Sequence, residues 1–283
     1  MRISRPRQWR SPRPRRPAPG TPAPARGTSL ALRFVALGYL AVPLLVPVGL
    51  VFWRTFEHGL APVWASVTTP AAIHAFWLTV EVAAIAVPLN AIFGVVAALA
   101  LVRGRFAGKW LLDALIDLPF AISPVVVGLA LLLVYGRSGW LSELPVQVIF
   151  AVPGIVLATV FVSLPFVARE VAPVLREVGD EQEQAAATLG ASRWQAFWRV
   201  TLPSIRWGLA YGVVLSTARA LGEFGAVSVV SGKIAGQTET LTLLVEKRFE
   251  NFDLAGAYAA STLLALIALA TLLAMTALRR RAE

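Results

Sequence analysis

Apolar residues in this chain gather into six long blocks separated by polar segments, unlike the alternating or helical stripes of soluble domains. A helix of about 20 apolar residues crosses the hydrocarbon core of a bilayer and satisfies its own backbone hydrogen bonds. The pattern therefore predicts an all-α membrane protein. Its six expected transmembrane helices are 30–53, 75–102, 113–135, 146–168, 207–231 and 254–278.

Two of these blocks contain prolines. Pro119 and Pro124 lie in the third block, and Pro153 and Pro165 lie in the fourth. Proline lacks a backbone N–H and its ring clashes with the preceding helical turn, so a helix with an interior proline kinks unless its neighbours compensate. We expect irregular helices in these two blocks.

The basic residues predict how the chain is oriented in the membrane. If the N-terminus lies in the cytoplasm, 19 of the 26 Lys and Arg residues fall on the cytoplasmic side and 5 on the opposite side. Cytoplasmic loops are normally the more basic ones. The count therefore predicts that both termini are cytoplasmic. Because the basic residues sit mostly at the ends of apolar blocks, the net charge of +10 does not indicate nucleic-acid binding.

Residues 1–28 are rich in Pro and Arg and contain almost nothing apolar to bury. Such a segment cannot offset the entropy lost on ordering, so we expect a disordered cytoplasmic tail that helps to fix the topology. A specific lipid or partner site is the alternative. The apolar block that follows is too long for a signal peptide, and residues 29–283 are expected to form the membrane domain.

The composition excludes several classes of site. Charged residues make up 15% of the chain, against about 25% in a typical soluble domain. There is no cysteine and there are only two histidines, so disulfides, thiolate metal sites and histidine clusters are not expected. The nearest string to a phosphate-binding loop, GRFAGKW at 104–110, has the wrong glycine spacing. We expect no catalytic residue, metal or cofactor in this chain.

One predicted cytoplasmic loop, 169–206, is much longer than the other. Residues 180–189 are good helix formers with acidic residues in the first turn, and Gly190 follows as a helix stop. Ser192 can cap a second helix over 193–200. Three aromatic residues of that helix would be exposed and would suit a protein interface: Trp194, Phe197 and Trp198.

The string QAAATLGASRWQAFWRVTLP at 184–203 resembles the EAA loop of ABC-importer permeases. The match keeps the family spacing, with Val200 in place of isoleucine and Gln184 in place of the first glutamate. The resemblance implies a coupling helix that seats on a separate ATPase subunit, which binds ATP and Mg; a purely structural re-entry before the fifth span is the alternative. The residues implied are Glu183, Gln184, Ala185, Ala186, Leu189, Gly190, Trp194, Leu202 and Pro203.

Three further stretches, at 117–136, 161–175 and 211–232, resemble sulfate/thiosulfate permeases of the CysW type. This resemblance implies a type I ABC importer permease fold in a bacterial inner membrane, crossing it several times in contact with lipid. It also implies a second permease of the CysT/CysU type, two ATPase copies and a periplasmic sulfate-binding protein as partners. Molybdate/tungstate permeases are similar at ARALGEFGA (218–226) and remain the alternative.

Within the spans, Arg219 and Glu223 are four residues apart on one predicted helix face and can pair. They could contact the anion in the pathway or gate, or form a structural ion pair that holds this helix against the second permease. Asn90 is expected to hydrogen-bond between helices. Weaker pathway candidates are Ser123, Ser228 and Ser231.

An energised importer also agrees with the charge of sulfate. Moving a dianion into a cell at roughly −150 mV costs about 7 kcal/mol. A proton-coupled secondary transporter would be expected to show an inverted repeat and buried acidic relays, and a membrane enzyme to show clustered His, Asp or Glu. Only Glu223 could serve as a relay, and neither pattern is present in the sequence.

Overall fold

A computed structural model describes residues 26–57, 59–143 and 145–282, so most of the predicted tail, up to residue 25, lies outside the described residues. The described residues form helices and connecting loops, without strands. The elements are α1 Arg26–Phe56, α2 Leu60–Val67, α3 Pro70–Arg103, α4 Lys109–Ala121, α5 Pro124–Tyr135, α6 Val152–Val178, α7 Glu181–Thr188, α8 Arg193–Ala196, the π-helical turn η1 Phe197–Thr201, α9 Leu202–Leu221, α10 Gly225–Val230, α11 Leu241–Glu250 and α12 Leu254–Ala282.

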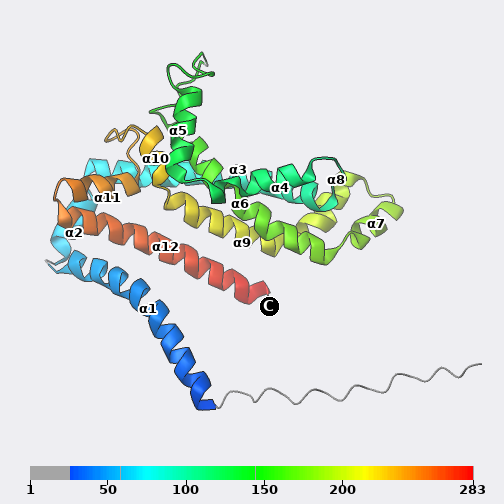
Figure 1. Ribbon diagram of the computed structural model, residues 1–283, viewed down its shortest axis with the longest axis horizontal. Helices are drawn as coiled ribbons and strands as arrows, with labels where there is room; N and C mark the ends of the chain where they lie inside the picture. The colour runs from blue at the N-terminus through cyan, green and yellow to red at the C-terminus, as the bar shows by residue number, and fades with distance from the viewer. Residues whose placement is uncertain (1–25, 58, 144, 283) are drawn as a thin grey trace, which may run out of the picture. The chain divides into compact units, whose positions relative to one another are not determined.

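The chain divides into two units, Met1–Gly49 and Leu50–Glu283, with the boundary inside α1. In the first unit the helix contains Pro43 and Pro47 and exposes apolar side chains such as Leu45. In the second unit α3, α6 and α9 pack on one another, with α4 against α6 and α12 against α9 (Figure 1). Helix α5 packs against α10.

Small residues let the three central helices approach closely. An added Cβ at Gly94 on α3 would lie 2.6 Å from Cβ of Val167 on α6, and one at Gly212 on α9 would lie 2.9 Å from Cα of the same valine. Val167 is fully buried with Val95, Ala98 and neighbouring apolar residues. Glycine at both positions therefore gives α6 room between α3 and α9.

Polar side chains also join these helices. Asn90 of α3 donates from Nδ2 to Oγ of Ser163 on α6 at 2.8 Å, and both residues are fully buried. The predicted interhelical hydrogen bond of Asn90 is thus confirmed. Arg169 of α6 pairs with Asp113 and Asp117 of α4 at 2.8 and 2.6 Å. Each contact fixes a rotation of one helix against its neighbour.

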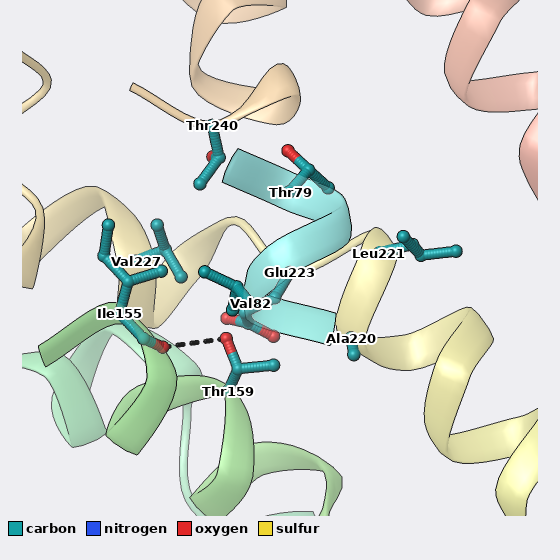
Figure 2. Close-up of a pocket in the computed structure, with 9 residues that line it drawn as sticks. All are labelled: Thr79, Val82, Ile155, Thr159, Ala220, Leu221, Glu223, Val227 and Thr240. Atoms are coloured by element: carbon teal, nitrogen blue, oxygen red, sulfur yellow. Dashed lines mark hydrogen bonds between the residues drawn. The ribbon is translucent and has the colours of Figure 1, made fainter. Parts of the chain in front are cut away.

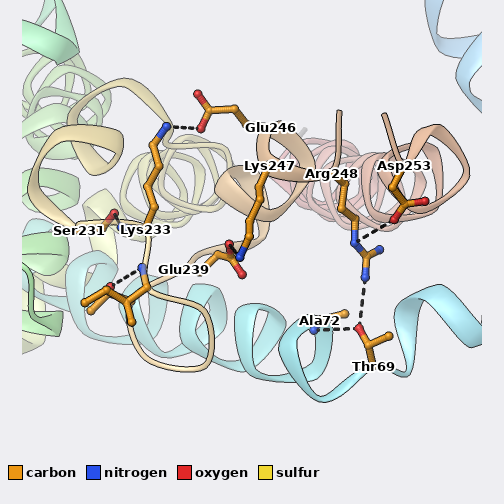
Figure 3. A network of polar contacts seen from close by, with 11 residues as sticks. Thr69, Ala72, Ser231, Lys233, Glu239, Glu246, Lys247, Arg248 and Asp253 are labelled. Carbon is orange, nitrogen blue, oxygen red and sulfur yellow. Dashed lines mark hydrogen bonds and ion pairs between the residues drawn. The ribbon is translucent and has the colours of Figure 1, made fainter. Parts of the chain in front are cut away.

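A second polar network joins α11 to its surroundings (Figure 3). Lys233 pairs with Glu246 at 2.6 Å, and Lys247 pairs with the buried Glu239 at 2.8 Å. Arg248 reaches the α2–α3 turn and the start of α12. This network fixes α11 at the same end of the bundle as α2.

Four helical segments are long and apolar enough to cross a membrane: Leu37–Phe56, Pro70–Arg103, Val152–Val178 and Leu254–Thr271. A fifth is present if the bent pair α4–α5 counts as one span. Helix α9 is not in this set; it contains Arg206, Tyr211, Ser216, Thr217 and Arg219, which lower its hydropathy.

Three of the expected helices have other bounds in the structure. The helix expected over 113–135 is broken at Ile122 and Ser123, where the chain bends by 111° between α4 and α5. Both residues have extended backbones, with ψ of 135° and 134°. Pro124 explains the break, because proline disfavours helical backbone in the residue before it and is well suited to the first turn of a new helix.

The helix expected over 146–168 instead runs from Val152 to Val178, since Pro153 occupies its first turn while Pro165 and Pro173 are accommodated inside. The long loop consequently starts at Gly179 and not at residue 169. The helix expected over 207–231 begins at Leu202, ends at Leu221 and resumes as α10. Gly222 closes α9, and the Glu223 carboxylate caps α10 by accepting from the N–H of Ala226.

Candidate functional site

The segment between α6 and α9 contains the helix expected over 180–189. Helix α7 ends in a hydrogen-bonded C-terminal turn, in which the N–H of Gly190 donates to Ala187 O and that of Ala191 to Ala186 O, both at 3.0 Å. Gly190 has φ +86°. This pair of bonds satisfies carbonyls that a helix end leaves unpaired, and the turn needs a left-handed residue, which glycine adopts without strain.

A second helix follows at once. Ser192 caps it, accepting from the N–H of Gln195 at 3.3 Å, while the Gln195 side chain accepts from the N–H of Ser192 at 2.9 Å. The second helix, expected over 193–200, does not end at residue 200, because α8 continues through η1 into α9. The π turn of η1 places Leu202 N–H on Phe197 O. Such wide turns let a helix accommodate a proline such as Pro203.

Aromatic side chains gather on α8 and η1. Trp194 stacks on Phe197 at 6.2 Å between ring centroids, and Trp198 meets both rings edge-on. Phe197 packs against the core, whereas Trp194 is 69% exposed. Leu189, between α7 and α8, is 89% exposed. The loop thus presents an apolar surface of the kind found at protein interfaces.

Glu183 is the acidic residue of α7 that turns toward the bundle. Its Oε2 accepts from Nε of Arg103 at 3.2 Å, and its Oε1 accepts from Arg103 Nη2 at 3.3 Å and from Thr201 Oγ1 at 2.9 Å. Sequence reasoning selected Glu183 but missed Arg103 and Thr201. The arginine is 80 positions away, and no local pattern signals that contact.

Arg219 and Glu223 form the expected pair, with Nη2 and Oε2 2.8 Å apart. The side chain of Glu223 is buried, while that of Arg219 is 32% exposed. Oε2 of Glu223 accepts no hydrogen bond, so its contact with Arg219 is an ion pair alone. Oε1 accepts a hydrogen bond from the N–H of Ala226 at 3.0 Å. Glu223 therefore joins the end of α9 to the start of α10.

The Glu223 carboxylate lines a cavity of about 10 Å³ between α3, α6, α9 and α10 (Figure 2). This volume is close to the space of a single water. Its polar lining also includes Thr79, Thr159 and Thr240, which sequence reasoning did not select.

The three candidate serines do not line this cavity. Ser123 is exposed at the α4–α5 break, and Ser228 donates to the carbonyl of Gly225 at 2.8 Å. Ser231 is buried and accepts from the N–H of Lys233 at 3.2 Å. The structure therefore brings Arg219 and Glu223 together and leaves the serines apart from them.

The chain thus combines helices that are long and apolar enough to cross a membrane with a helical loop that has an exposed apolar surface. Residues 90–283 match the family described as the binding-protein-dependent transport system inner membrane component. The chain belongs to this family. It is therefore a membrane permease subunit and not an enzyme.

The relatives are close over most of the chain. The sulfate transport system permease protein CysW of Synechocystis sp. is 51% identical over 251 residues, which cover 87% of this chain and 91% of that protein. CysW of Escherichia coli (strain K12) is 50% identical over 244 residues, 85% of this chain and 84% of that protein. CysT of the same strain is 39% identical over 250 residues, which cover 87% of this chain and 90% of that protein.

A solved structure shares the fold. One chain of a bacterial ABC transporter that imports the acidic polysaccharide alginate superposes with a TM-score of 0.75 at 16% identity, covering 90% of this chain and 96% of that one. At this identity the likeness speaks for the fold alone. The predicted importer permease fold is confirmed at that level.

Proposed function

We propose that this chain is a permease subunit of an ATP-driven importer that carries sulfate, and also thiosulfate, into the cytoplasm. The observation that carries the proposal is the 51% identity to a CysW sulfate permease over 87% of the chain. An identity of this size over 251 residues favours a shared substrate over a shared scaffold alone. The proposed site is a multi-pass position in the bacterial inner membrane.

The proposed topology has six spans with both termini in the cytoplasm. The bent pair α4–α5 counts as one span, and α9 with α10 as another, in addition to the four apolar helical segments. The 19-to-5 distribution of basic residues supports this orientation. In this arrangement the α7–α8 loop lies in the cytoplasm.

The proposed role of that loop is to couple the permease to an ATPase subunit. Gln184, Ala185 and Leu189 on and beside α7 are exposed, as is Trp194 on α8. Small and apolar side chains on a short helix suit a groove of another protein, where close approach is needed. Since this chain has no phosphate-binding loop, ATP and Mg would be bound by that partner.

The proposed assembly contains a second permease of the CysT type, two ATPase copies and a periplasmic sulfate-binding protein. The 39% identity between this chain and CysT supports a related partner, because two similar subunits can enclose one pathway. An alginate transporter of the same fold has been solved in complex with a periplasmic protein. Selection of the anion would rest mainly on such a binding protein.

Arg219 is the proposed contact with the anion. Its guanidinium neutralises the buried Glu223 yet stays one-third exposed, so it can donate to an oxyanion as well. A lone arginine in a span costs about 3 kcal/mol on insertion scales, which the ion pair offsets. The pair would hold the guanidinium in place beside the pathway.

The experiment is uptake by the assembled complex in liposomes. The two permeases, the ATPase and the binding protein are reconstituted, and labelled sulfate is measured with ATP, without ATP, and with a proton ionophore. We expect ATP-dependent uptake that the ionophore leaves unchanged and that unlabelled thiosulfate reduces. Competition by molybdate or tungstate in place of sulfate would assign the other substrate class, and uptake driven by a proton gradient would contradict the proposal.

A further inference from the structure

Apolar packing contributes little to holding helix α7 against the rest of the chain. It has no buried residue, and it lies between two glycines with left-handed backbones, Gly179 at φ +67° and Gly190 at φ +86°. A Cβ at either position would meet no atom within 4 Å, so backbone conformation and not space requires glycine there. Short turns of this kind absorb the dihedral changes of a hinge.

The side chain of Glu183 ties this helix to two others. Both of its carboxylate oxygens accept from Arg103, the last residue of α3, and Oε1 also accepts from Thr201 in η1. A two-point contact between a guanidinium and a carboxylate fixes orientation as well as distance. The ion pair is three-quarters buried on both sides, so it is less screened than a surface pair.

The remaining donors of Arg103 hold the end of α6. Nη1 donates to Leu175 O at 3.1 Å, and Nη2 donates to Gly179 O. These carbonyls belong to the last turn of α6 and to the turn beyond it, which no further helical N–H can satisfy. Thr201, the third member, is 5% exposed. The ends of α3 and α6, the helix α7 and the residue before α9 therefore meet around the Arg103–Glu183 ion pair.

We propose that Arg103, Glu183 and Thr201 form a clamp that transmits a displacement of α7 to α3 and α9 together. This inference rests on the proposed function, in which α7 is moved by an ATPase. Helix α3 carries Thr79 to the Glu223 cavity, and α9 carries Arg219. With the clamp closed, a push on α7 moves both helices; with it open, α7 turns on its glycines and the motion is lost. The three side chains are positioning residues and touch neither ATP nor sulfate.

The test compares two variants of α7 in the assembled complex. Glu183→Gln removes the charge that Arg103 holds, and Glu181→Gln removes an exposed charge from the same helical turn. The readout is sulfate imported per ATP hydrolysed in liposomes, with co-purification of the ATPase measured alongside. We expect Glu183→Gln to keep the ATPase bound and to lower the ratio of sulfate to ATP roughly five-fold, which is the low end of the couplings found between sites in proteins. Glu181→Gln should leave both the bound ATPase and the ratio unchanged.

A purely structural role would lower uptake and ATP hydrolysis in proportion and leave the ratio unchanged; that result, or equal ratios in the two variants, would overturn the clamp. If Glu183→Gln does not assemble, Thr201→Val against Thr201→Ser decides, because only valine lacks the hydroxyl that donates to Glu183. We expect valine to lower the ratio and serine to retain it. Failure of the proposed function would appear instead in the unaltered complex, as absence of ATP-driven sulfate uptake.

Discussion

Arg248 on α11 donates from Nη2 to the backbone carbonyl of Ser66 at 2.8 Å, although 182 positions separate the two residues. The same guanidinium donates to Thr69 Oγ1 at 3.2 Å and to Gly256 O at 3.0 Å. One side chain thus connects α11 to the α2–α3 turn and to the first turn of α12. Lysine has one nitrogen and cannot reach partners in this fan-shaped arrangement.

Arg248→Lys should therefore destabilise the protein by about 1–2 kcal/mol, since partly buried carbonyls lose their donors. The measurement is the thermal unfolding midpoint of the purified chain in detergent. Arg105→Lys is the matched control, because Arg105 is exposed. Equal midpoints for the two variants would show that the Arg248 contacts contribute nothing.

Gly94→Ala tests the close approach of α3 and α6. The new Cβ would lie 2.6 Å from Cβ of Val167 and 2.9 Å from the backbone N of Ala168, and that backbone cannot yield without shifting α6. Overpacking of this kind typically costs about 1–3 kcal/mol. Unfolding in a denaturant series should show a loss in this range. Gly49→Ala, at a position with no atom within 4 Å of the added Cβ, should show no loss.

A compensating substitution sharpens this test. Val167→Ala in the Gly94→Ala background removes Cγ1 of Val167, which would lie 2.7 Å from the new methyl group. The contacts with Cβ of residue 167 and with the backbone N of Ala168 remain, so only part of the stability should be recovered. Val167→Ala alone should be destabilising, because it leaves a cavity in a fully buried position. Strictly additive losses in the double variant would mean that the two helices do not touch at this point.

The comparison of sequence and structure has a physical pattern. Local signals predicted local structure well: Gly190 ends α7 and Ser192 caps α8. Helix ends that depend on which neighbours satisfy the backbone were predicted poorly. Pro124 breaks one predicted helix, whereas Pro165 lies inside α6 without ending it. The same residue type gives both outcomes, and the sequence alone does not distinguish them.

Contacts between distant positions are a separate case. The spacing of Arg219 and Glu223 makes their pairing a helical property, so it was predictable. Arg103 and Glu183 are on different helices, and their meeting depends on the packing of α3 against α6. The polar residues around the Glu223 cavity likewise come from several helices. Local patterns along the sequence do not show which distant positions will come into contact.

Gly190→Pro tests the coupling role of the loop. Proline fixes φ near −65° and has no N–H, whereas Gly190 has φ +86° and donates to Ala187 O at 3.0 Å. The turn after α7 should be lost while the membrane helices remain. We expect normal insertion, measured in membrane fractions, with loss of ATPase co-purification. Gly222→Ala, at a position with ordinary φ and no close contact, is the control. Normal sulfate uptake by Gly190→Pro would contradict the coupling role.

The Arg219–Glu223 pair can be tested for two roles at once. Arg219→Gln leaves the 3%-exposed Glu223 carboxylate without its counter-charge, which should cost about 3–5 kcal/mol of stability. Adding Glu223→Gln removes the unpaired charge and should restore most of that stability, as measured by thermal unfolding of the complex in detergent. If the pair is only structural, sulfate uptake should recover together with stability. If Arg219 donates to the anion, the double variant should be stable and still impaired in uptake by roughly ten-fold or more, equivalent to the loss of one charge-assisted hydrogen bond. Recovery of both quantities would exclude Arg219 from the pathway.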